Sequence, residues 1–539
     1  MHSVPVRAAV LGALVAALVT LPGLGNGTLW DNSETAYGEV AREVLLTHDW
    51  VVMHLNGAAW FVQPPLFFWI AALSGKLFGV TAFALRLPAA LATTAMGGAL
   101  GYVTARVAGM RAGIIAAVVL STSLMQAILG RLAVMDALLD LCVAVAILCW
   151  FRALQAPPNR AAFFGGALAL ALGTLVKGPV APVIVVLVIA VWLVWERRSS
   201  APVAFPSPAT FAIGCVLFVV IVAPWFVLEA LRAGAPSLGT LIGHYTIGRY
   251  TGVIENQSGP WWYYLPVIVL GFFPWIAFVP VAALGAVDAA RTRAGSFERL
   301  ALIWIVVPLV FFSFAQTKLP NYIALILPGL AIVVALWFER LIGAADRRAA
   351  FWSALAIPLV ILALGVAATA FIHSNHLEDA ITIVVPQAEV LGVMMLIGSL
   401  LTVAAIASRW NAVAPYVLGA TSLAFVLFIA FVAEPAAEAL KPIPAIAHVI
   451  QEQRAPGAVV AIRGVSGSYA LMFYAQPGIV TVDEGASLGA VCAARDLYLV
   501  TRAADIPGLE QIAAERGRYT LELGSLRGVS LLHVNGPGC

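Results

Sequence analysis

Several segments of the chain place acidic and basic side chains beside long apolar runs. The stretch from Trp30 to Trp50 carries seven ionisable residues among 21, although charged residues make up 11% of the whole chain. Four shorter polar segments lie further along and contribute Asp136, Lys177, His244, Arg249 and Lys318. Charges at the ends of apolar segments are costly unless they are solvated or paired, and they commonly mark functional sites.

This mixture of cations and carboxylates indicates chemistry at a phosphate or pyrophosphate group. Arginine can bind a phosphate with two N–H groups, and lysine neutralises it as a point charge. If the phosphate is also a leaving group, each well-placed donor stabilises the transition state by about 3–4 kcal/mol. The carboxylates of Glu34 and Asp136 would activate or orient an acceptor, hold a substrate amine, or hold a divalent ion.

The elements that must position these residues are membrane-spanning helices. The chain has 539 residues, of which 62% are hydrophobic, and a mean hydropathy of +0.97, so we predict a polytopic membrane protein. The net charge of +3 is small and the basic residues are scattered, so the sequence does not predict a basic surface that binds nucleic acid. Because about 20 apolar residues cross a bilayer, we predict thirteen spans, at 7–25, 83–105, 111–130, 134–153, 160–176, 178–196, 208–231, 262–288, 299–316, 319–339, 351–373, 386–408 and 411–432.

Arginine clusters between the spans predict the orientation, since short cytoplasmic loops are rich in Lys and Arg. The clusters alternate consistently if the segment 64–80 lies in the interface instead of crossing, and this segment is short, begins with two prolines and contains Lys76. The N-terminus is then cytoplasmic, and the first span is a retained anchor. The polar segments all emerge on the opposite side, together with everything beyond residue 433.

The composition changes near residue 436, where the membrane helices end. Short β-rich runs such as GAVVAI, GIVTV, DLYLVT, RYTLEL and VSLLHV alternate with helical stretches at 443–454 and 505–516. We predict a transmembrane domain over 1–435, with a first loop at 26–82, and a soluble α/β domain over 436–539 that serves as a lid, docking or stability module. Cys492 and Cys539 lie in this tail, where a disulfide is permitted but not demanded. The sequence contains no P-loop, G-x-G-x-x-G or zinc-ligand spacing, so no metal site is predicted.

Each polar residue also has a purely structural interpretation. Glu34 and Glu39 could solvate a surface helix with Asn32 or Ser33 as its N-cap. Lys177 and Lys318 could extend along the spans towards the membrane surface, and Asp136 could favour the dipole of a helix that it begins. His244 could be an ordinary loop residue, and Arg249 an interfacial anchor beside the aromatic residues at 261–264. The functional prediction therefore depends on the placement of all these residues on one side.

The same segments resemble a known family of enzymes. The ordered series LWDNSETAYGEVAREVLLTHDWVVMHLNGAAWFVQPPLFFW, LRLPAAL, GRLAVMD, ALGTLVKGPVA, HYTIGRY, PWWYYLPVIVLGFFPW and KLPNYIALILPGLA is similar to bacterial membrane glycosyltransferases of the GT-C type, above all the lipid A aminoarabinose transferases and the protein O-mannosyltransferase-like group. The resemblance covers residues 20 to 335. It implies a GT-C fold of about 13 transmembrane helices with a C-terminal periplasmic α/β domain.

The resemblance also implies a function and a cellular location. The expected activity is an inverting transfer of a sugar from a polyprenyl (undecaprenyl) phosphate donor to a periplasmic-side acceptor, such as lipid A or another envelope glycolipid. The protein would be a multi-pass protein of the bacterial inner membrane, with its active site facing the periplasm. The resemblance implies no particular cofactor, and it leaves open whether the enzyme uses a divalent cation. If the acceptor is a lipid A phosphate, it scarcely needs a base, whereas a hydroxyl acceptor needs one.

Roles for individual residues follow from the resemblance position by position. It implies catalytic roles for Glu34 and Asp136, with Asp31 as a substitute acid, and it implies donor phosphate binding by Arg249, Lys177, Lys318 and His244. Tyr37, Gln63 and Tyr322 would bind substrate. Two departures weaken the implication of aminoarabinose in particular. Aminoarabinose transferases typically have Asp-Glu-Thr-Arg-Tyr where this chain has Ser33 to Tyr37, and Glu-Lys-Pro where it has Val62 to Pro64.

Three other functions remain open at this point. Transfer to a protein hydroxyl would match the O-mannosyltransferase-like group. A transporter of a lipid-linked substrate is less favoured, because transporters usually place ionisable groups near the middle of the membrane and often have two matching halves. A non-catalytic assembly factor on the same scaffold would account for the two departures. Turnover of a labelled donor separates these alternatives.

Overall fold

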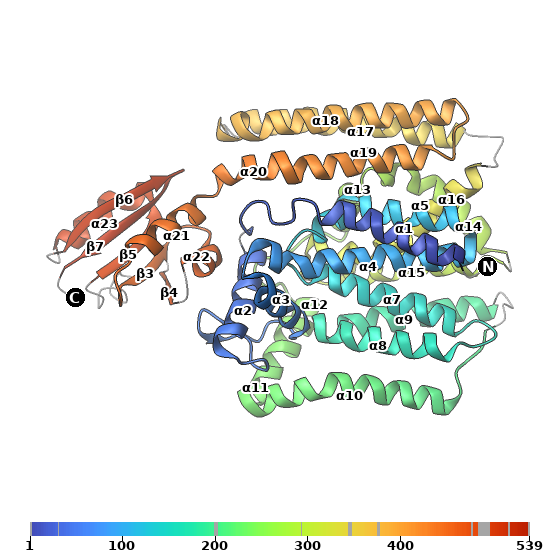
Figure 1. The fold of residues 1–539 in the computed structure, drawn as a ribbon, viewed down its shortest axis with the longest axis horizontal. Helices are drawn as coiled ribbons and strands as arrows, with labels where there is room; N and C mark the ends of the chain where they lie inside the picture. Colours follow the sequence, from blue (N-terminus) through green and yellow to red (C-terminus); the bar gives the residue numbers. More distant parts are fainter. Residues whose placement is uncertain are drawn as a thin grey trace. The chain divides into compact units, whose positions relative to one another are not determined.

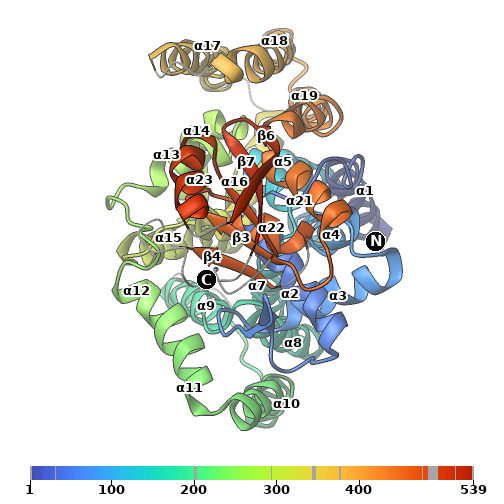
Figure 2. The same ribbon diagram turned by 90° about the vertical axis from the view of Figure 1, so that its left-hand side faces the viewer.

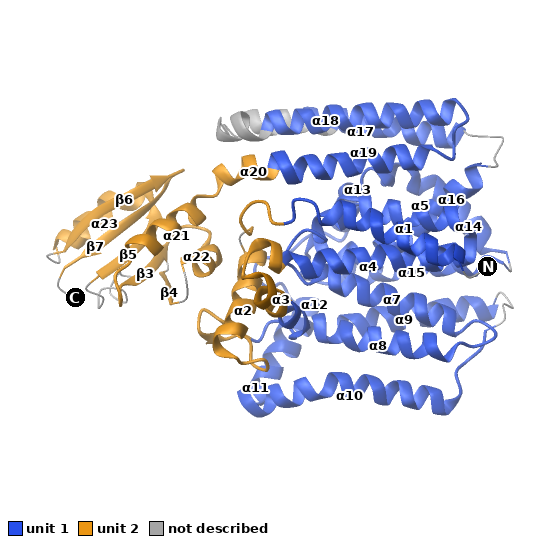
Figure 3. Ribbon diagram, in the orientation of Figure 1, with its two compact units in different colours: residues 1–24, 61–70, 86–433 blue, residues 25–60, 71–85, 434–539 orange. Residues whose placement is uncertain are grey.

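A computed structural model provides the fold of the chain (Figure 1). It describes all residues except 1–2, 31, 199–202, 293, 343–347, 375–377, 476–477, 483–495, 516–517 and 537–539. The candidate acid Asp31 and the two tail cysteines, Cys492 and Cys539, lie outside the described residues. The chain divides into two compact units, coloured blue and orange in Figure 3. Unit 1 comprises 1–24, 61–70 and 86–433, and unit 2 comprises 25–60, 71–85 and 434–539.

Unit 1 is a bundle of helices that run side by side (Figures 1 and 2). Its long helices are α1 (Ser3–Thr20), α4 (Ala82–Ala108), α5 (Met110–Thr122), α7 (Asp136–Ala153), α8 (Arg160–Lys177), α9 (Val180–Arg198), α10 (Pro208–Ala233), α14 (Val279–Ala290), α15 (Ser296–Phe314), α16 (Leu327–Ile342), α17 (Arg348–Ser374), α18 (Glu378–Ala407) and α19 (Ala414–Phe428). Shorter segments connect them: α6 (Leu124–Leu129), α11 (Ala235–Leu238), η1 (Gly239–Gly248), α12 (Arg249–Thr251), α13 (Tyr264–Gly271), η2 (Trp275–Phe278), η3 (Pro320–Ile326) and η4 (Ile429–Ala433).

The predicted fold class, a polytopic helical membrane protein with a C-terminal sheet domain, is confirmed. Among the described residues, nine helices are long and apolar enough to cross a membrane, or ten if the bent pair Tyr264–Gly271 and Trp275–Ala290 forms one span. A helix occupies each of the thirteen predicted positions, but the count of thirteen spans stays a prediction. The segment 64–80 forms α3 (Leu66–Phe78), whose 13 residues extend about 20 Å and fall short of the bilayer core.

A buried ion pair holds together the end of the bundle that is rich in arginine. Arg299 at the start of α15 donates to both carboxylate oxygens of Glu196 in the last turn of α9, at 2.6 and 3.0 Å. The same guanidinium donates to the carbonyls of Ala290 and Thr292, both at 2.7 Å. Since buried charges need partners of this kind, these contacts fix the ends of α9, α14 and α15 to one another.

Unit 2 contains a five-stranded sheet formed by the C-terminal part of the chain. Its strand order is β4-β3-β5-β7-β6, with β3 parallel to β4 and β5 and the remaining pairs antiparallel. The strands are β3 (Val459–Arg463), β4 (Ile479–Val482), β5 (Asp496–Arg502), β6 (Tyr519–Leu526) and β7 (Val529–Asn535), and the helices are α20 (Glu434–Ala437), η5 (Glu438–Leu440), α21 (Pro442–Gln453), α22 (Ser468–Ala475), η7 (Ala503–Asp505) and α23 (Ile506–Glu515). All five predicted strands and both predicted helices are present, whereas α22 was not predicted.

The first polar loop belongs to the same unit as this sheet. It contains α2 (Ser33–Thr47), which packs against α22, and the two-residue strands β1 (His54–Leu55) and β2 (Ala58–Ala59). The carboxylate of Glu438 accepts hydrogen bonds from the backbone N–H and hydroxyl of Thr28 at 2.9 and 2.7 Å. The Tyr474 hydroxyl accepts one from Leu29 N at 2.7 Å. The side chain of Asn56 bonds to the backbone of Ile479 through both its amide nitrogen and its oxygen.

The interpretation of α2 as a solvated surface helix is wrong. Glu34 and Glu39 are 1% and 0% exposed, so neither side chain faces solvent. Burial raises the pKa of Glu39 above its ordinary value, and the adjacent Arg42, which donates at 2.6 Å, opposes this shift. Asn32 precedes the helix as predicted, but its side chain makes no capping hydrogen bond.

Candidate functional site

An ion pair joins Asp136 to Lys177 at one end of the helical hairpin formed by α7 and α8. Asp136 is the first residue of α7 and Lys177 the last residue of α8. The two meet because a short loop at the far end makes neighbouring helices antiparallel. Lys177 Nζ lies 2.6 Å from Asp136 Oδ1, and both side chains are largely buried. Gly178 ends α8 with φ +69° and ψ −148°, a conformation that is essentially restricted to glycine, and so directs the chain into α9.

A cation fixes the segment that leads into Asp136. Arg131 donates to the carbonyls of Val19, Thr20 and Pro22 at 3.1, 3.0 and 2.8 Å. These carbonyls lie at the C-terminal end of α1, where they have no partners within the helix. Arg131 therefore ties the start of α7 to the end of α1.

Arg249 is the second cation of the site. It follows the π-helical segment η1 and begins α12. One terminal nitrogen donates to the Tyr322 hydroxyl at 3.2 Å, and the other donates to Glu255 at 3.0 Å. The guanidinium also lies over the Tyr245 ring, 5.6 Å from its centre. Tyr322 additionally faces Lys177, whose ammonium lies 5.2 Å from the ring centre, so this tyrosine contacts both cations.

Backbone hydrogen bonds fix the Arg249 segment to the loop before η3. Gln316 N and Thr317 N donate to the carbonyls of Tyr250 and Arg249, both at 3.0 Å. The Thr317 hydroxyl donates to Gly252 O at 2.8 Å and accepts from the backbone N–H of Ile254 at 3.0 Å. Two segments far apart in sequence therefore form one rigid support for the Arg249 guanidinium.

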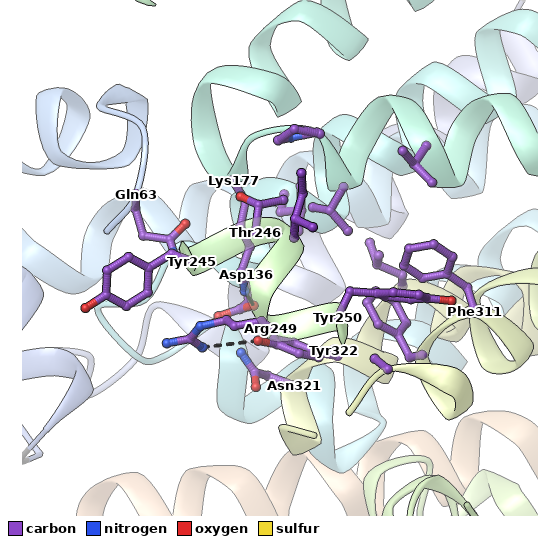
Figure 4. Close-up of a pocket in the computed structure, with 18 of the residues that line it drawn as sticks. Gln63, Asp136, Lys177, Tyr245, Thr246, Arg249, Tyr250, Phe311, Asn321 and Tyr322 are labelled. Carbon is purple, nitrogen blue, oxygen red and sulfur yellow. Dashed lines mark hydrogen bonds and ion pairs between the residues drawn. The ribbon is translucent and has the colours of Figure 1, made fainter. Parts of the chain in front are cut away.

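These residues line a pocket of about 360 Å³ within unit 1 (Figure 4). The polar part of the wall includes Gln63, Asp136, Asp140, Lys177, Thr246, Arg249, Asn321 and Tyr322. An apolar part of the wall comes from η1, α9 and α15 and includes Ile242, Val180, Val183, Phe311 and Phe312. In Figure 4 Asp136, Arg249, Tyr322 and Asn321 gather together, while Phe311 extends the wall away from Gln63. The pocket therefore has a polar end, which contains both cations and carboxylates, and an apolar wall.

Several residues singled out by the sequence lie elsewhere. His244 is exposed and packs edge-on against Tyr245, 4.8 Å between ring centres, but it does not line the pocket. Glu34 and Tyr37 belong to unit 2. There, a Glu34 oxygen accepts from Trp30 N at 2.9 Å, and the Tyr37 ring contacts Trp60. The pocket thus brings together Asp136, Lys177, Arg249, Gln63 and Tyr322 of the predicted set.

Lys318 also lies outside the pocket. Its ammonium donates to the carbonyls of Ser313 and Ala315 at 2.8 and 2.7 Å, and to Phe312 O at 3.4 Å. These are the terminal carbonyls of α15, so Lys318 caps that helix. Desolvation lowers the pKa of the Lys318 ammonium from its ordinary value. The contacts assign Lys318 a structural role.

Asp140 and Asn321 line the pocket but were not predicted. Asp140 lies one turn after Asp136 on the same face of α7 and is 2% exposed. It lines the pocket, and its Oδ2 has no hydrogen-bond partner among the described residues. The four-residue spacing in DALLD was the available signal. Asn321, which directly precedes Tyr322, gave no comparable signal. Within the described part of the chain, no three His, Cys, Asp or Glu side chains are grouped so that they could hold a metal ion.

Comparison with known proteins assigns the chain to a family. Residues 62–227 match the family model described as dolichyl-phosphate-mannose-protein mannosyltransferase. The chain is 30% identical over 385 residues to the undecaprenyl phosphate-alpha-4-amino-4-deoxy-L-arabinose arabinosyl transferase of Serratia proteamaculans, which covers 69% of this chain and 67% of that protein. The chain belongs to this arabinosyl transferase family. The predicted resemblance is therefore confirmed.

The fold of the arabinosyl transferase family is also matched by a solved structure. The crystal structure of ArnT from Cupriavidus metallidurans bound to undecaprenyl phosphate superposes with a TM-score of 0.81 at 22% identity and covers 97% of both chains. The similarity in sequence is less extensive. The match to the arabinosyl transferase of Edwardsiella ictaluri, at 30% identity, covers 60% of this chain but only 58% of that relative.

The capping role of Lys318 gives a testable expectation. Lys318→Met should lower the free energy of unfolding by about 2–4 kcal/mol, because at least two buried carbonyls lose a charged donor. In protein that remains folded, binding of undecaprenyl phosphate should change less than twofold. Thermal unfolding in detergent and a lipid-binding titration measure the two effects. Lys76→Met, at an exposed lysine, is the control and should change neither. Weaker binding with unchanged stability would restore Lys318 to the phosphate site.

Proposed function

We propose that this protein is a membrane glycosyltransferase that transfers a sugar from a polyprenyl phosphate, such as undecaprenyl phosphate, to an acceptor at the periplasmic face of the inner membrane. The observation that carries this proposal is the convergence of Lys177, Arg249 and Tyr322 at the polar end of a pocket whose other side is lined by apolar residues of η1, α9 and α15. A phosphate with an isoprenoid tail has the same two parts. Membership of the arabinosyl transferase family supports the same donor class.

Arg249 and Lys177 position the donor phosphate. Arg249 offers N–H groups for bidentate contact, and the aromatic and backbone contacts around it hold the guanidinium in place before the donor arrives. Lys177 adds a point charge, and its bond to Asp136 keeps the ammonium directed at the pocket. Gln63 lines the pocket where the family resemblance implies a lysine, so the phosphate is held by these two cations and the neutral Gln63 amide.

The proposed reaction is a direct displacement at the anomeric carbon of the sugar. The acceptor oxygen forms the new bond as the bond between that carbon and the phosphate oxygen breaks, and the leaving electron pair stays on the polyprenyl phosphate. Lys177 and Arg249 stabilise this developing charge. A lipid A phosphate acceptor is already anionic and needs no base. A hydroxyl acceptor would give up its proton to a carboxylate, for which Asp136 is the candidate in the pocket.

The acceptor we favour is lipid A or another envelope glycolipid. A protein hydroxyl is the second candidate, because the matching family model is that of a protein mannosyltransferase. Lipid A and envelope glycans from cells with and without the protein should differ by the mass of one sugar residue, measured by mass spectrometry. A sugar found only on protein would select the second candidate.

Turnover of a labelled donor tests the activity itself. Purified protein in liposomes should release free polyprenyl phosphate from a polyprenyl phosphate-linked sugar in the presence of lipid A. A panel of pentose and hexose donors identifies the sugar that is transferred. The matched control is Arg291→Ala, which removes an exposed arginine that forms an ion pair with Asp288. Movement of the intact donor across the membrane without release would favour a transporter and overturn the proposal.

A further inference from the structure

A second cavity, of about 690 Å³, lies within unit 1 at the opposite end of α7 and α8. Asp136 begins α7 and lines the first pocket, whereas Arg152, in the last turn of the same helix, lines the second. Sixteen residues of α-helix separate the two positions by about 24 Å. Asn159, the N-cap of α8, also lines the second cavity. The second cavity is therefore a separate site.

The charge of this cavity is positive and uncompensated. Arg106, in the last turn of α4, and Arg152 both line it. Arg106 donates to the Tyr102 hydroxyl at 3.3 Å, and Arg152 donates to Pro157 O at 3.4 Å. Both are long hydrogen bonds to neutral groups, and each uses one of the five N–H groups of a guanidinium. No acidic residue is among the described residues that line the cavity, so two cations share one space without a counterion.

Much of the remaining wall is apolar, although Tyr102, Gln155 and Asn159 also line the cavity. Ala9 of α1, Gly98 and Ala99 of α4, and Val145 and Leu148 of α7 line the cavity between the helices. All these helices belong to the membrane-spanning bundle, and their arginine-bearing ends are those that the positive-inside rule assigns to the cytoplasm. The cavity therefore joins a dicationic head to an apolar channel at the level of a lipid headgroup.

We propose that this cavity binds an anionic glycerophospholipid of the inner leaflet, with its phosphate between Arg106 and Arg152 and one acyl chain against α1 and α4. A phosphodiester accepts bidentate hydrogen bonds from arginine. Basic pockets between membrane helices on the cytoplasmic side are suited to such headgroups, and the cavity volume lies within the range of about 300–1,000 Å³ that is typical of ligand sites. The site is independent of sugar transfer and depends on the proposed orientation only for the choice of leaflet.

Binding of defined lipids to the full-length protein tests this site. Delipidated protein in detergent is titrated with phosphatidylglycerol and with phosphatidylcholine, and bound lipid is counted by native mass spectrometry. Phosphatidylglycerol should bind at least about tenfold more tightly, and Arg106→Gln with Arg152→Gln should abolish the difference. The control variant Arg198→Gln with Arg291→Gln removes the same charge from exposed arginines outside the cavity. This control should retain the difference in affinity between the two lipids.

The apolar channel is tested without a change of charge. Ala99→Leu fills the wall beside the arginines and should weaken phosphatidylglycerol binding, while glycerol phosphate, which lacks acyl chains, should bind far more weakly than the phospholipid. Equal affinity for the two lipids in the unaltered protein would overturn the proposal, and this comparison needs no variant to fold. The proposal would also be overturned if the control variant lost the preference for phosphatidylglycerol to the same extent. The preference would then depend on the net charge of the protein and not on this cavity.

Discussion

Arg249→Ala is expected to lower kcat/KM for a polyprenyl phosphate-linked donor by about 10²- to 10³-fold, a larger effect than any other single substitution in the pocket. The guanidinium lies at the polar end of the pocket and contacts Tyr322, Glu255 and the Tyr245 ring. Arg249→Lys should recover only part of the activity, because an ammonium cannot form the bidentate contact. Release of polyprenyl phosphate from a labelled donor is the measurement.

Controls separate this catalytic effect from a loss of folding. Thermal unfolding of the Arg249 variants should stay close to that of the parent, since backbone hydrogen bonds and not the side chain anchor the segment to the loop at 316–317. Arg291→Ala removes an arginine that is exposed together with its partner Asp288, and should leave turnover unchanged. Activity of Arg249→Ala within twofold of the parent would remove Arg249 from the mechanism.

Lys177→Met is expected to cost about 3–5 kcal/mol of unfolding free energy in addition to its effect on transfer, because it leaves the Asp136 carboxylate buried without its partner. The double variant Lys177→Met with Asp136→Leu should regain most of that stability, since an apolar pair of similar volume replaces the buried ions. Transfer should remain at least about 100-fold reduced in both variants. Thermal unfolding and donor turnover are measured on the same preparations.

The double variant distinguishes a structural ion pair from a catalytic one. If the pair only connects α7 to α8, activity should return together with stability. If Lys177 holds the donor phosphate, stability should return alone. Recovery of both properties would therefore contradict the proposed role of Lys177.

Much of the site could be predicted because its residues lie at helix ends. A lysine at the end of one apolar run and an aspartate at the start of the preceding run must meet when the two helices form a hairpin, so the proximity of Asp136 and Lys177 follows from the pattern alone. The strands of the C-terminal sheet were equally visible, because each is a short apolar run bounded by turn residues.

Other features depend on contacts that the sequence does not encode locally. The sequence pattern suggests that Lys318 is a phosphate ligand, because nothing in the neighbouring residues reveals that its ammonium binds three carbonyls at the end of α15. Asp140 was overlooked because it lies inside an apolar run. The burial of Glu34 and Glu39 results from packing with elements distant in sequence, whereas their local pattern is that of a solvated helix.

Unit 2 combines segments from the two ends of the sequence, and this arrangement has a consequence for biosynthesis. Thr28 is hydrogen-bonded to Glu438, a partner 410 positions later in the chain, and Leu29 and Asn56 are bonded to residues still closer to the C-terminus. At a ribosomal rate of about 5–20 residues per second, these partners emerge roughly 20–80 s after the loop that they hold. The contacts that hold the first loop therefore cannot form until these partners have been translated. A premature stop codon near residue 430 would consequently disrupt the N-terminal loop as well as remove the tail.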